Sequence, residues 1–561
     1  MLVTIIALLL STHFYPIHKD DFGCFPCRCQ EKDDGAKHLA NCHLIGVLRL
    51  KDVSLNKQNI TSIAEDAFTS SRGLQRLSLS GNRLSVLPQN VFAPLESLQL
   101  LDLGRLGLQQ VESDAFAGLS SLKILSLSQN RLNALPRDLL RPMPALEQLL
   151  LGGKSDEEGK LIVDGNELSV LSQELLQHSP RLQVLDLSEN KLTSLPHNVL
   201  DRIPLLETLD LRSNKLTELP GEIFSGLDKL QKLDLSWNTL SELPAQVFAG
   251  LINLQELDLR QNKLSKLPAE VFSGRSNLTW LQLEWNKLNE LPAEVFSGLS
   301  SLQKLNLSFN SLTRLHAEVF SGLSKLQKLD LWSNLLSELP AEVFSALGNL
   351  QRLYLFDNKL NELPPDAFAN LFAELSNLRV LDLGRNNLSV LPSHGFAGLR
   401  NLQVLNLGEC KEVLVSRFIC SLYEFDLAAV LNNTLPMFSK LNQISKLNQI
   451  SKLPAEFFSG LGNLQKVYLD SNKLAQLPAN IFSSLSSLQI LDLSSNDLTH
   501  LHAEAFSGLN NLQTLNLGSN KLSELPAAVY SGLSSLQELY LYQNELSGLP
   551  AICSSIDCLN P

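Results

Sequence analysis

The chain has 561 residues, of which 44% are hydrophobic and 19% charged, which is enough apolar material to bury a core and excludes intrinsic disorder for most of the chain. Its 46 basic and 58 acidic side chains give a formal net charge of −12, so no electrostatic surface for nucleic acid or an anionic membrane is expected. The eight cysteines are too few for a fold that is built on disulfides.

The chain begins with a short apolar run, residues 2–10, which Ser11 and Thr12 follow. The run resembles the hydrophobic segment of a secretory signal, although no Lys or Arg precedes it; a buried strand is the alternative. We therefore expect residues 1–23 to be a signal-like segment and the protein to be extracellular and secreted. No stretch approaches the roughly 18 to 20 apolar residues of a membrane-spanning helix, so no membrane segment is predicted in this chain.

Four cysteines follow outside any repeat, namely Cys24, Cys27, Cys29 and Cys42. In a secreted chain they indicate two disulfides, whose pairing the spacing does not determine. Zinc is the alternative, because Cys-x-x-Cys is also a metal-ligand spacing. The signal-like run favours the disulfides.

From there on, one unit returns every 24 residues with the pattern Leu-x-x-Leu-x-Leu-x-x-Asn-x-Leu-x-x-Leu-Pro. With Gln58, Leu106, Cys410 and Asn448 in the same register, the pattern predicts about twenty units. The position of the Asn is held by Asn82, Asn130, Asn166, Asn190, Asn214, Asn238, Asn262, Asn286, Asn310, Asn334, Asn358, Asn386, Asn472, Asn496, Asn520 and Asn544.

The alternation within each unit predicts one strand per repeat. Leu233 and Leu235, for example, point inward while Asp234 points to the opposite face. No unit can bury its leucines without a neighbour, so parallel strands stack about 4.8 Å apart in a solenoid. The Asn is expected to turn inward and pair with backbone groups of adjacent turns, because its amide both donates and accepts hydrogen bonds.

A phenylalanine lies ten residues after the Asn in most units. Aromatic residues at strict repeat spacing are typical of a core rather than of a ligand-binding row. The predicted spine consists of Phe68, Phe92, Phe116, Phe224, Phe248, Phe272, Phe296, Phe320, Phe344, Phe368, Phe396, Phe458, Phe482 and Phe506, with Tyr530 in a late unit.

Segments such as LPAEVFSGLSSLQKLNLSFN, residues 291–310, resemble the typical 24-residue class of extracellular leucine-rich repeat proteins, which includes variable lymphocyte receptors, Slit, the acid-labile subunit and Toll-type ectodomains. The resemblance covers about residues 45–550. It implies an α/β fold, a leucine-rich repeat solenoid curved into a horseshoe with a parallel β-sheet on the concave face, which binds proteins or other macromolecules. It also implies that residues 24–50 form a cysteine-rich N-terminal cap.

The pattern is interrupted in three places. Twelve extra residues between Asn130 and Asn166, around residues 152–160, predict a polar surface loop, and four more enter near residues 372–375. Over residues 411–447 the leucine ladder is lost, and the phrase of residues 440–445 is repeated at 446–451. This segment is a functional loop, a hinge between two repeat blocks, or a translated non-coding segment. Cys410 beside it is a buried thiol or forms a disulfide with Cys420.

At the C-terminus the family has a Trp-x-Cys-x-Cys arrangement and further cysteines, whereas only Cys553 and Cys558 are present here. Either these two cysteines, expected to form a disulfide, make a reduced cap, or the chain is truncated, which leaves open whether the natural form lacks a membrane anchor. The expected organisation after the N-terminal cap is a first repeat block at 51–410, an irregular insertion at 411–447, a second block at 448–550 and a truncated or reduced cap at 551–561.

The candidate ligand-binding surface lies on the strands. Positions six, four and two before each Asn face away from the core, and all four tryptophans fall there or one residue beyond. Exposed aromatic area is unfavourable unless a partner covers it, and Trp and Tyr are common binding anchors; stabilising cross-strand pairs are the alternative. The predicted ligand-binding residues are Trp237, Trp280, Trp285, Phe309, Trp332, Tyr354, Phe356, Arg260, Lys304, Lys328 and Arg352.

Other chemistry finds little support. Asp210, Asp234, Asp258 and Asp330 share one strand position and raise the alternative of calcium, but interleaved cations and the frequency of Leu-Asp-Leu in this repeat class favour repeat consensus. No Ser, Cys or carboxylate recurs with a base at catalytic spacing, and no phosphate loop is present. We expect no enzyme, no cofactor and no metal.

Sequons for N-glycosylation occur at Asn59, Asn277, Asn387 and Asn432. A fifth, at Asn306, lies beside the aromatic surface, so either it is unused or the binding hypothesis is weakened.

The sequence therefore predicts a secreted recognition protein, immune-like in kind, that binds a protein or glycan on its concave surface. The alternatives are an extracellular-matrix or adhesion scaffold, for which self-association is possible, and a receptor ectodomain whose membrane anchor is missing. Neither nucleic acid nor a membrane is expected as a partner.

Overall fold

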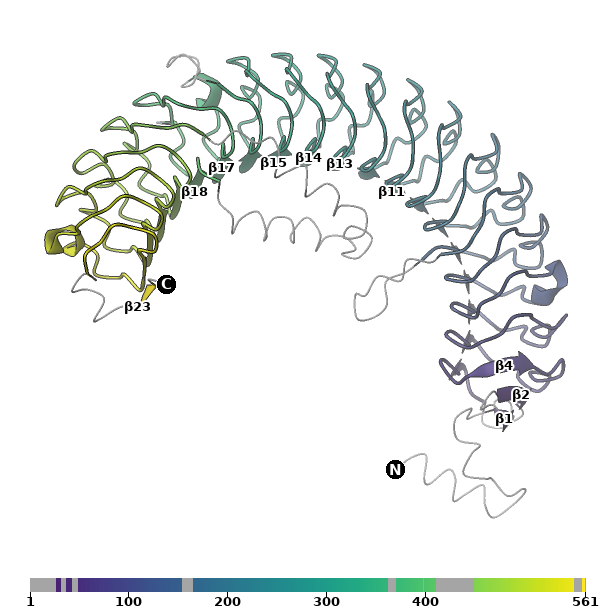
Figure 1. Cartoon of the computed structure of the whole chain (residues 1–561). Coiled ribbons are helices and arrows are strands. Elements are labelled where there is room, and N and C mark those ends of the chain that lie inside the picture. The colour runs from purple at the N-terminus through teal and green to yellow at the C-terminus, as the bar shows by residue number, and fades with distance from the viewer. Residues whose placement is uncertain are drawn as a thin grey trace. The chain divides into compact units, whose positions relative to one another are not determined.

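The computed structural model describes residues 27–31, 37–42, 49–153, 165–361, 370–396, 398–409, 448–548 and 557–559. The chain divides into two compact units, Met1–Asp234 and Leu235–Pro561. In each unit the chain winds into successive coils, and each coil contributes one short strand to a parallel sheet (Figure 1).

In the first unit eight strands pair in chain order and all run parallel. They are β3 (Asp52–Ser54), β5 (Arg76–Ser78), β6 (Leu100–Asp102), β7 (Ile124–Ser126), β8 (Gln148–Leu150), β9 (Val184–Asp186), β10 (Thr208–Asp210) and β11 (Lys232–Asp234). A small separate sheet precedes them, in which β1 (Arg28–Glu31) pairs antiparallel with β2 (Lys37–Asn41), and β2 pairs parallel with β4 (Ile60–Ile63).

The second unit repeats this arrangement, and its strands line the inner side of the curve that its own coils follow (Figure 1). Its strands also pair parallel in chain order. They are β12 (Glu256–Asp258), β13 (Trp280–Gln282), β14 (Lys304–Asn306), β15 (Lys328–Asp330), β16 (Arg352–Tyr354), β17 (Val380–Asp382), β18 (Val404–Asn406), β19 (Lys466–Tyr468), β20 (Ile490–Asp492), β21 (Thr514–Asn516), β22 (Glu538–Tyr540) and β23 (Asp557–Leu559).

The predicted solenoid with a parallel sheet is thus confirmed, with little helix in it. Opposite the strands, the described coils consist largely of turns. The 3-10 helices that the structure describes are η2 (Ser113–Phe116) and η3 (Ala527–Tyr530). The fold therefore depends on the sheet and on the packing between coils, because short turns have almost no stability of their own.

The asparagine ladder has the role that the sequence predicts. The Nδ2 atom of Asn286 donates to the carbonyl oxygens of Leu259 and Leu283, at 3.0 and 3.1 Å. Its Oδ1 accepts a hydrogen bond of 3.0 Å from the backbone N–H of Leu264. One buried amide thereby satisfies three backbone groups from two coils, and the pattern recurs along both units.

The phenylalanine spine is buried, with exposed fractions of 0% for Phe272 and Phe296. Between Phe344 and Phe396 the ring in the stack is that of Phe372, at centroid distances of 6.5 and 5.7 Å. The predicted member Phe368 lies outside the described residues. The four extra residues of this repeat shift the spine position to Phe372, which strict spacing from the Asn does not anticipate.

The sequence pattern assigns both Cys410 and Asn448 to positions of the asparagine ladder, on either side of the irregular residues 411–447. The structure corrects this assignment. Asn448 accepts from the backbone N–H of Leu388 and donates to the carbonyls of Leu383 and Leu407, at 3.0, 3.1 and 2.8 Å. It therefore fills the position that comes next after Asn386.

The sheet is continuous across this irregularity, since β18 pairs in register with β19 and Leu405 lies opposite Val467. Residues 410–447 lie outside the described residues, and with them the alternatives for that segment and for Cys410 and Cys420.

Cys27 and Cys42 form a disulfide with an S–S distance of 2.08 Å. This pair supports the disulfide interpretation of the N-terminal cysteines over zinc. Cys24 and Cys553 are outside the described residues, as is the signal-like segment. For Cys29 and Cys558 the structure describes only the backbone, in β1 and β23.

Candidate functional site

Four of the predicted aromatic residues form a continuous row in the second unit. The rings of Trp285 and Phe309 stack with centroids 3.7 Å apart and planes 6° apart. Phe309 meets Trp332 at 4.8 Å, and Trp332 meets Phe356 edge-on at 5.9 Å. We call Trp285, Phe309, Trp332 and Phe356 the aromatic ladder.

Mutual packing buries part of this ladder, which corrects the expectation of a fully exposed surface. Only 7% of Trp332 and 3% of Phe356 is exposed, and the Arg385 guanidinium lies 5.9 Å from the Phe356 ring centroid. These two residues match the alternative of cross-strand stabilisation. Trp285 and Phe309 are half-buried and remain accessible to a partner.

The remaining predicted aromatics, Trp237, Trp280 and Tyr354, are also half-buried. Trp280 and Tyr354 belong to β13 and β16, and each has a cation above its ring, as described below. Trp237 lies outside these strands, one residue before Asn238, as Trp285 does before Asn286.

The backbone at three of these aromatics is left-handed. The residue directly before a ladder asparagine has a positive φ, which is 55° at Trp237, 56° at Trp285 and 52° at Phe309. This conformation holds in place a hydrogen bond to the next coil, such as that of 3.1 Å from the N–H of Trp285 to the carbonyl of Ser308. A bulky side chain costs on the order of 1–2 kcal/mol there. Other coils place Ser, Gln or Arg at this position, so the fold itself does not require aromatic residues.

Three cations lie side by side on the same face, at the first position of strands β14, β15 and β16. Lys304 is directly opposite Lys328, and Lys328 is directly opposite Arg352. Lys304 and Arg352 are exposed and Lys328 is half-buried. Like charges directly opposite each other destabilise a sheet. We call these three residues the cation row.

Neighbouring rings offset part of this repulsion. The Nζ of Lys304 lies 5.7 Å from the Trp280 ring centroid, and that of Lys328 lies 5.7 Å from the Tyr354 ring centroid. Cation–π contacts at exposed sites contribute about 0.5–1 kcal/mol each. The aromatic residues therefore hold the cations on the surface rather than neutralise them.

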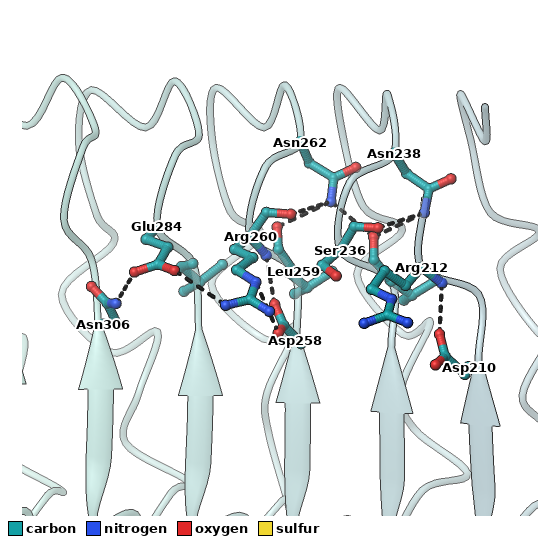
Figure 2. A network of polar contacts seen from close by, with 12 residues as sticks. Asp210, Arg212, Ser236, Asn238, Asp258, Leu259, Arg260, Asn262, Glu284 and Asn306 are labelled. Atoms are coloured by element: carbon teal, nitrogen blue, oxygen red, sulfur yellow. Dashed lines mark hydrogen bonds and ion pairs between the residues drawn. The ribbon is translucent and has the colours of Figure 1, made fainter. Parts of the chain in front are cut away.

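Arg260 does not belong to the accessible cations, contrary to its predicted role in binding. Only 5% of it is exposed, and its guanidinium lies 3.3 Å from Asp258 and 3.6 Å from Glu284 (Figure 2). Glu284 also accepts a hydrogen bond from the Asn306 side chain. Burial raises the pKa of Glu284, although the nearby Arg260 opposes the shift. Arg260 thus compensates buried carboxylates.

The row of aspartates caps the ends of the strands. A carboxylate oxygen of Asp258 accepts from the backbone N–H of Arg260 at 3.0 Å, and Asp330 accepts from Trp332 at 3.2 Å. In the first unit Asp210 does the same for Arg212, at 2.9 Å (Figure 2). These local bonds support the consensus interpretation over calcium. Within the part of the chain that is described, no group of three or more His, Cys, Asp or Glu side chains is arranged to hold a metal ion.

Because Asp258, Glu284 and Asp330 are each at most 9% exposed, the charge that reaches solvent on strands β14 to β16 comes mainly from the cation row. This local positive surface contrasts with the net charge of −12. The sequence pattern alone does not distinguish the buried carboxylates from the exposed cations, since acidic and basic residues alternate along it.

The sequons differ in how their amides are engaged. The Nδ2 atom of Asn306, to which a glycan would be attached, donates to Glu284, and Oδ1 accepts from the N–H of Ser308 at 3.0 Å. This geometry favours an unused sequon beside the aromatic ladder. Asn277 is exposed, Asn59 and Asn387 are half-buried, and Asn432 lies outside the described residues.

Comparison with known proteins identifies the repeat. The family model for leucine rich repeats matches residues 49–106, 101–154, 159–216, 204–264, 228–288, 276–335, 324–373, 370–411, 446–498 and 486–546. Among curated proteins none matches the chain.

Several solved structures have the same fold. A leucine-rich repeat protein of Leptospira interrogans is 26% identical, over 89% of this chain and 91% of that one, with a TM-score of 0.50. YopM from Yersinia enterocolitica is 23% identical, over 92% and 88%, with a TM-score of 0.51. Toll of Drosophila, solved in complex with Spatzle, is 20% identical, over 87% and 73%, with a TM-score of 0.50. The last two similarities concern the fold alone.

Proposed function

Because the chain belongs to the leucine-rich repeat family, whose repeats form a protein-interaction scaffold, we propose that it binds an acidic protein partner on the sheet face of its second unit. The contacts would come from the cation row together with the half-buried aromatics Trp280, Trp285, Phe309 and Tyr354. A leucine-rich repeat solenoid is typically a non-enzymatic scaffold, and the proposal involves no catalysis.

The observation that carries the proposal is the register of the cation row. Lys304, Lys328 and Arg352 face one another directly across three strands, so their repulsion is present in the free protein. A carboxylate-rich surface relieves this repulsion on binding, and complementary charge also steers association. The carboxylates of the same face are occupied by backbone N–H groups and by Arg260.

The aromatic residues supply the apolar part of the surface. Trp, Tyr and Arg are the residue types most enriched at binding hot spots. Strands about 4.8 Å apart from β13 to β17 extend over roughly 19 Å, so that the face supplies a part of the ~800 Å² per partner of a standard interface. The left-handed backbone at Trp285 and Phe309 supports a role in binding, since Ser and Gln satisfy the fold at this position.

We place this binding outside the cell, in a secreted recognition protein of an immune-like kind. The apolar run at residues 2–10 and the disulfide between Cys27 and Cys42 support this part of the proposal, because disulfides persist in oxidising compartments. In the described residues, the structure has no helix that is long and apolar enough to cross a membrane.

Charge reversal tests the proposal. The variant K304E/K328E/R352E is compared with K263E/K287E/K359E, whose exposed lysines each follow a ladder asparagine directly, so that both variants change the net charge equally. Binding of a fluorescent poly-glutamate peptide is measured by anisotropy. We expect the first variant to lose binding at least about tenfold, which corresponds to ~1.4 kcal/mol, and the second to retain it. Equal binding by both variants and the wild type would show that the cation row is not the site.

A further inference from the structure

A groove of about 480 Å³ lies along the edge of the second unit at which strands β16 to β20 begin. It is distinct from the aromatic ladder, whose residues follow the strands instead of preceding them. Two rows of side chains line it. The amide row, three residues before each strand, consists of Asn349, Asn377, Asn401 and Asn463, with Ser487 at the end.

The second row lies one residue before each strand and consists of Gln351, Arg379, Gln403 and Gln465. Residues two apart in an extended chain point to the same side, so the two rows face the groove together. The backbone of this row is held by bonds between coils, such as that of 2.8 Å from the N–H of Gln403 to the carbonyl of Arg379.

The amide row is rigidly organised. Nδ2 of Asn377 donates to the carbonyl of Gly348 at 2.8 Å, and Asn401 and Asn463 make the same bond to the preceding coil at 2.8 and 2.9 Å. Each bond uses one of the two N–H groups of the amide, and Oδ1 remains as an acceptor. Because the four asparagine coils of the groove repeat the arrangement, their Oδ1 atoms form a preorganised line.

The side chains of the second row are not engaged in this way. Among the described residues, the amides of Gln351, Gln403 and Gln465 and the guanidinium of Arg379 have no side-chain hydrogen bond or ion pair. The groove therefore presents fixed acceptors on one side and unpaired donors and acceptors on the other. Among the described residues that line the groove, Arg379 is the cation and none is a carboxylate.

The chemistry of the lining limits the classes of ligand that fit the groove. Small-molecule pockets and the cores of protein interfaces are mostly apolar, whereas every described residue that lines this groove is polar. Nucleic acid requires several cations to replace its counterions, and the described lining contains one, Arg379. An occupant with hydroxyl groups along its whole length suits rows of amides, because each hydroxyl donates and accepts a hydrogen bond.

We propose that this groove binds an oligosaccharide that carries a carboxylate, with Arg379 paired to the carboxylate and the amides of Gln403 and Gln465 bonded to hydroxyls. A guanidinium forms two parallel hydrogen bonds with a carboxylate, which gives preference for an acidic sugar over a neutral one. The proposal stands on residues that the acidic-protein surface does not use.

The test uses the full chain and three probes, namely an oligogalacturonate, a neutral malto-oligosaccharide and a poly-glutamate peptide, in titration calorimetry. The variant Q403L/Q465L removes two amides, and its matched control Q303L/Q327L changes the residues immediately before β14 and β15, outside the groove. We expect oligogalacturonate to bind the wild type and the control equally, and Q403L/Q465L about tenfold more weakly, a loss typical of one or two hydrogen bonds.

Arg379→Gln tests the carboxylate separately, and it is expected to abolish the preference for oligogalacturonate over the neutral sugar. Thermal melting of each variant verifies that it is folded. The proposal is overturned if the wild type binds neither sugar, if Q403L/Q465L binds oligogalacturonate as the wild type does, or if the poly-glutamate peptide is the probe whose binding depends on Gln403 and Gln465.

Discussion

The second unit contains two rows of aromatic rings, the phenylalanine spine and the aromatic ladder. Both follow the same repeat spacing, but the geometry of their rings differs. From Phe248 to Phe344 the spine rings lie 6.1–6.3 Å apart with planes within 5–15°. In the aromatic ladder the distances run from 3.7 to 5.9 Å and the angles from 6° to 82°. Uniform geometry arises where every coil encloses its ring in the same way, and irregular geometry where individual rings were added to coils that fold without them.

This difference separates the rings that stabilise the fold from the rings that are accessible to a partner. A spine ring occupies a closed space that its own coil and both neighbours form, so its removal leaves a cavity. A ladder ring such as Trp285 lies on the surface over a left-handed backbone, so its removal leaves solvent and relieves strain. Substitutions in the two rows test the distinction.

The largest effect is expected at the spine. Phe296→Ala should lower the free energy of unfolding by about 3–5 kcal/mol, because the ring is fully buried between Phe272 and Phe320. Urea denaturation followed by circular dichroism measures this loss. A loss below about 1 kcal/mol, the scale of a surface substitution, would mean that the spine is not the core.

A smaller effect is expected at the asparagine ladder, which holds the coils on which both rows are built. Asn286→Ala removes the partner of the Leu264 N–H and of the carbonyls of Leu259 and Leu283, and buried unpaired groups cost about 1–3 kcal/mol. The control is Asn277→Ala, which changes an exposed asparagine. Similar urea midpoints for the two variants would contradict the role of the ladder.

In the aromatic ladder, a substitution should leave the free energy of unfolding almost unchanged. Trp285→Asn loses a stacking contact worth about 0.5–1.5 kcal/mol, but asparagine tolerates a left-handed backbone, which returns a similar amount. The same urea experiment should place this variant within about 1 kcal/mol of the wild type. A loss as large as that of Phe296→Ala would remove the distinction between the two rows.

The smallest effect is expected on the sheet face of the first unit, where the free energy of unfolding should depend on pH through Asp210. Burial and the neighbouring carboxylates of Asp234 and Asp186 raise the pKa of Asp210 to about 8, and Arg212 opposes the shift. In the unfolded chain this carboxyl titrates near 3.9. Between about pH 4 and pH 8 the folded state therefore holds a proton that the unfolded state releases, and stability falls as the pH rises through this window.

Asp210 is half-buried, so solvent screens its charge. We therefore expect a smaller pKa shift than burial alone would give, and a slope well below that of one whole proton. Asp210→Asn should flatten it. Urea midpoints at several pH values compare the variant with the wild type, and an unchanged slope would contradict this role of Asp210.

Much of the fold was predictable because each coil buries its leucines only against the next. The ladder role of Asn286 and the burial of Phe296 follow from the 24-residue spacing alone. The same reasoning failed where spacing changes. Counting along the sequence makes Cys410 the next position of the asparagine ladder after Asn386. In the structure Asn448 makes the ladder bonds, because its amide is the one that reaches the backbone of Leu388.

The candidate site was less predictable. The strand pattern placed Trp332, Phe356 and Arg260 on the sheet face that points away from the core, but it did not give their exposure. Their burial comes from side chains of adjacent coils, Phe309 and Arg385 for the rings and Glu284 for the guanidinium. The groove before β16 to β20 was missed, although its repeated Asn three residues before each strand was a visible signal.

The sequence by itself determined the repeat, the direction in which each strand residue points and the identity of the core, because period-2 and 24-residue patterns encode which atoms must leave water. Only the tertiary structure decided which surface residues stay accessible. That outcome depends on how side chains 24 or more residues apart pack or pair across neighbouring strands, and no single repeat contains this information.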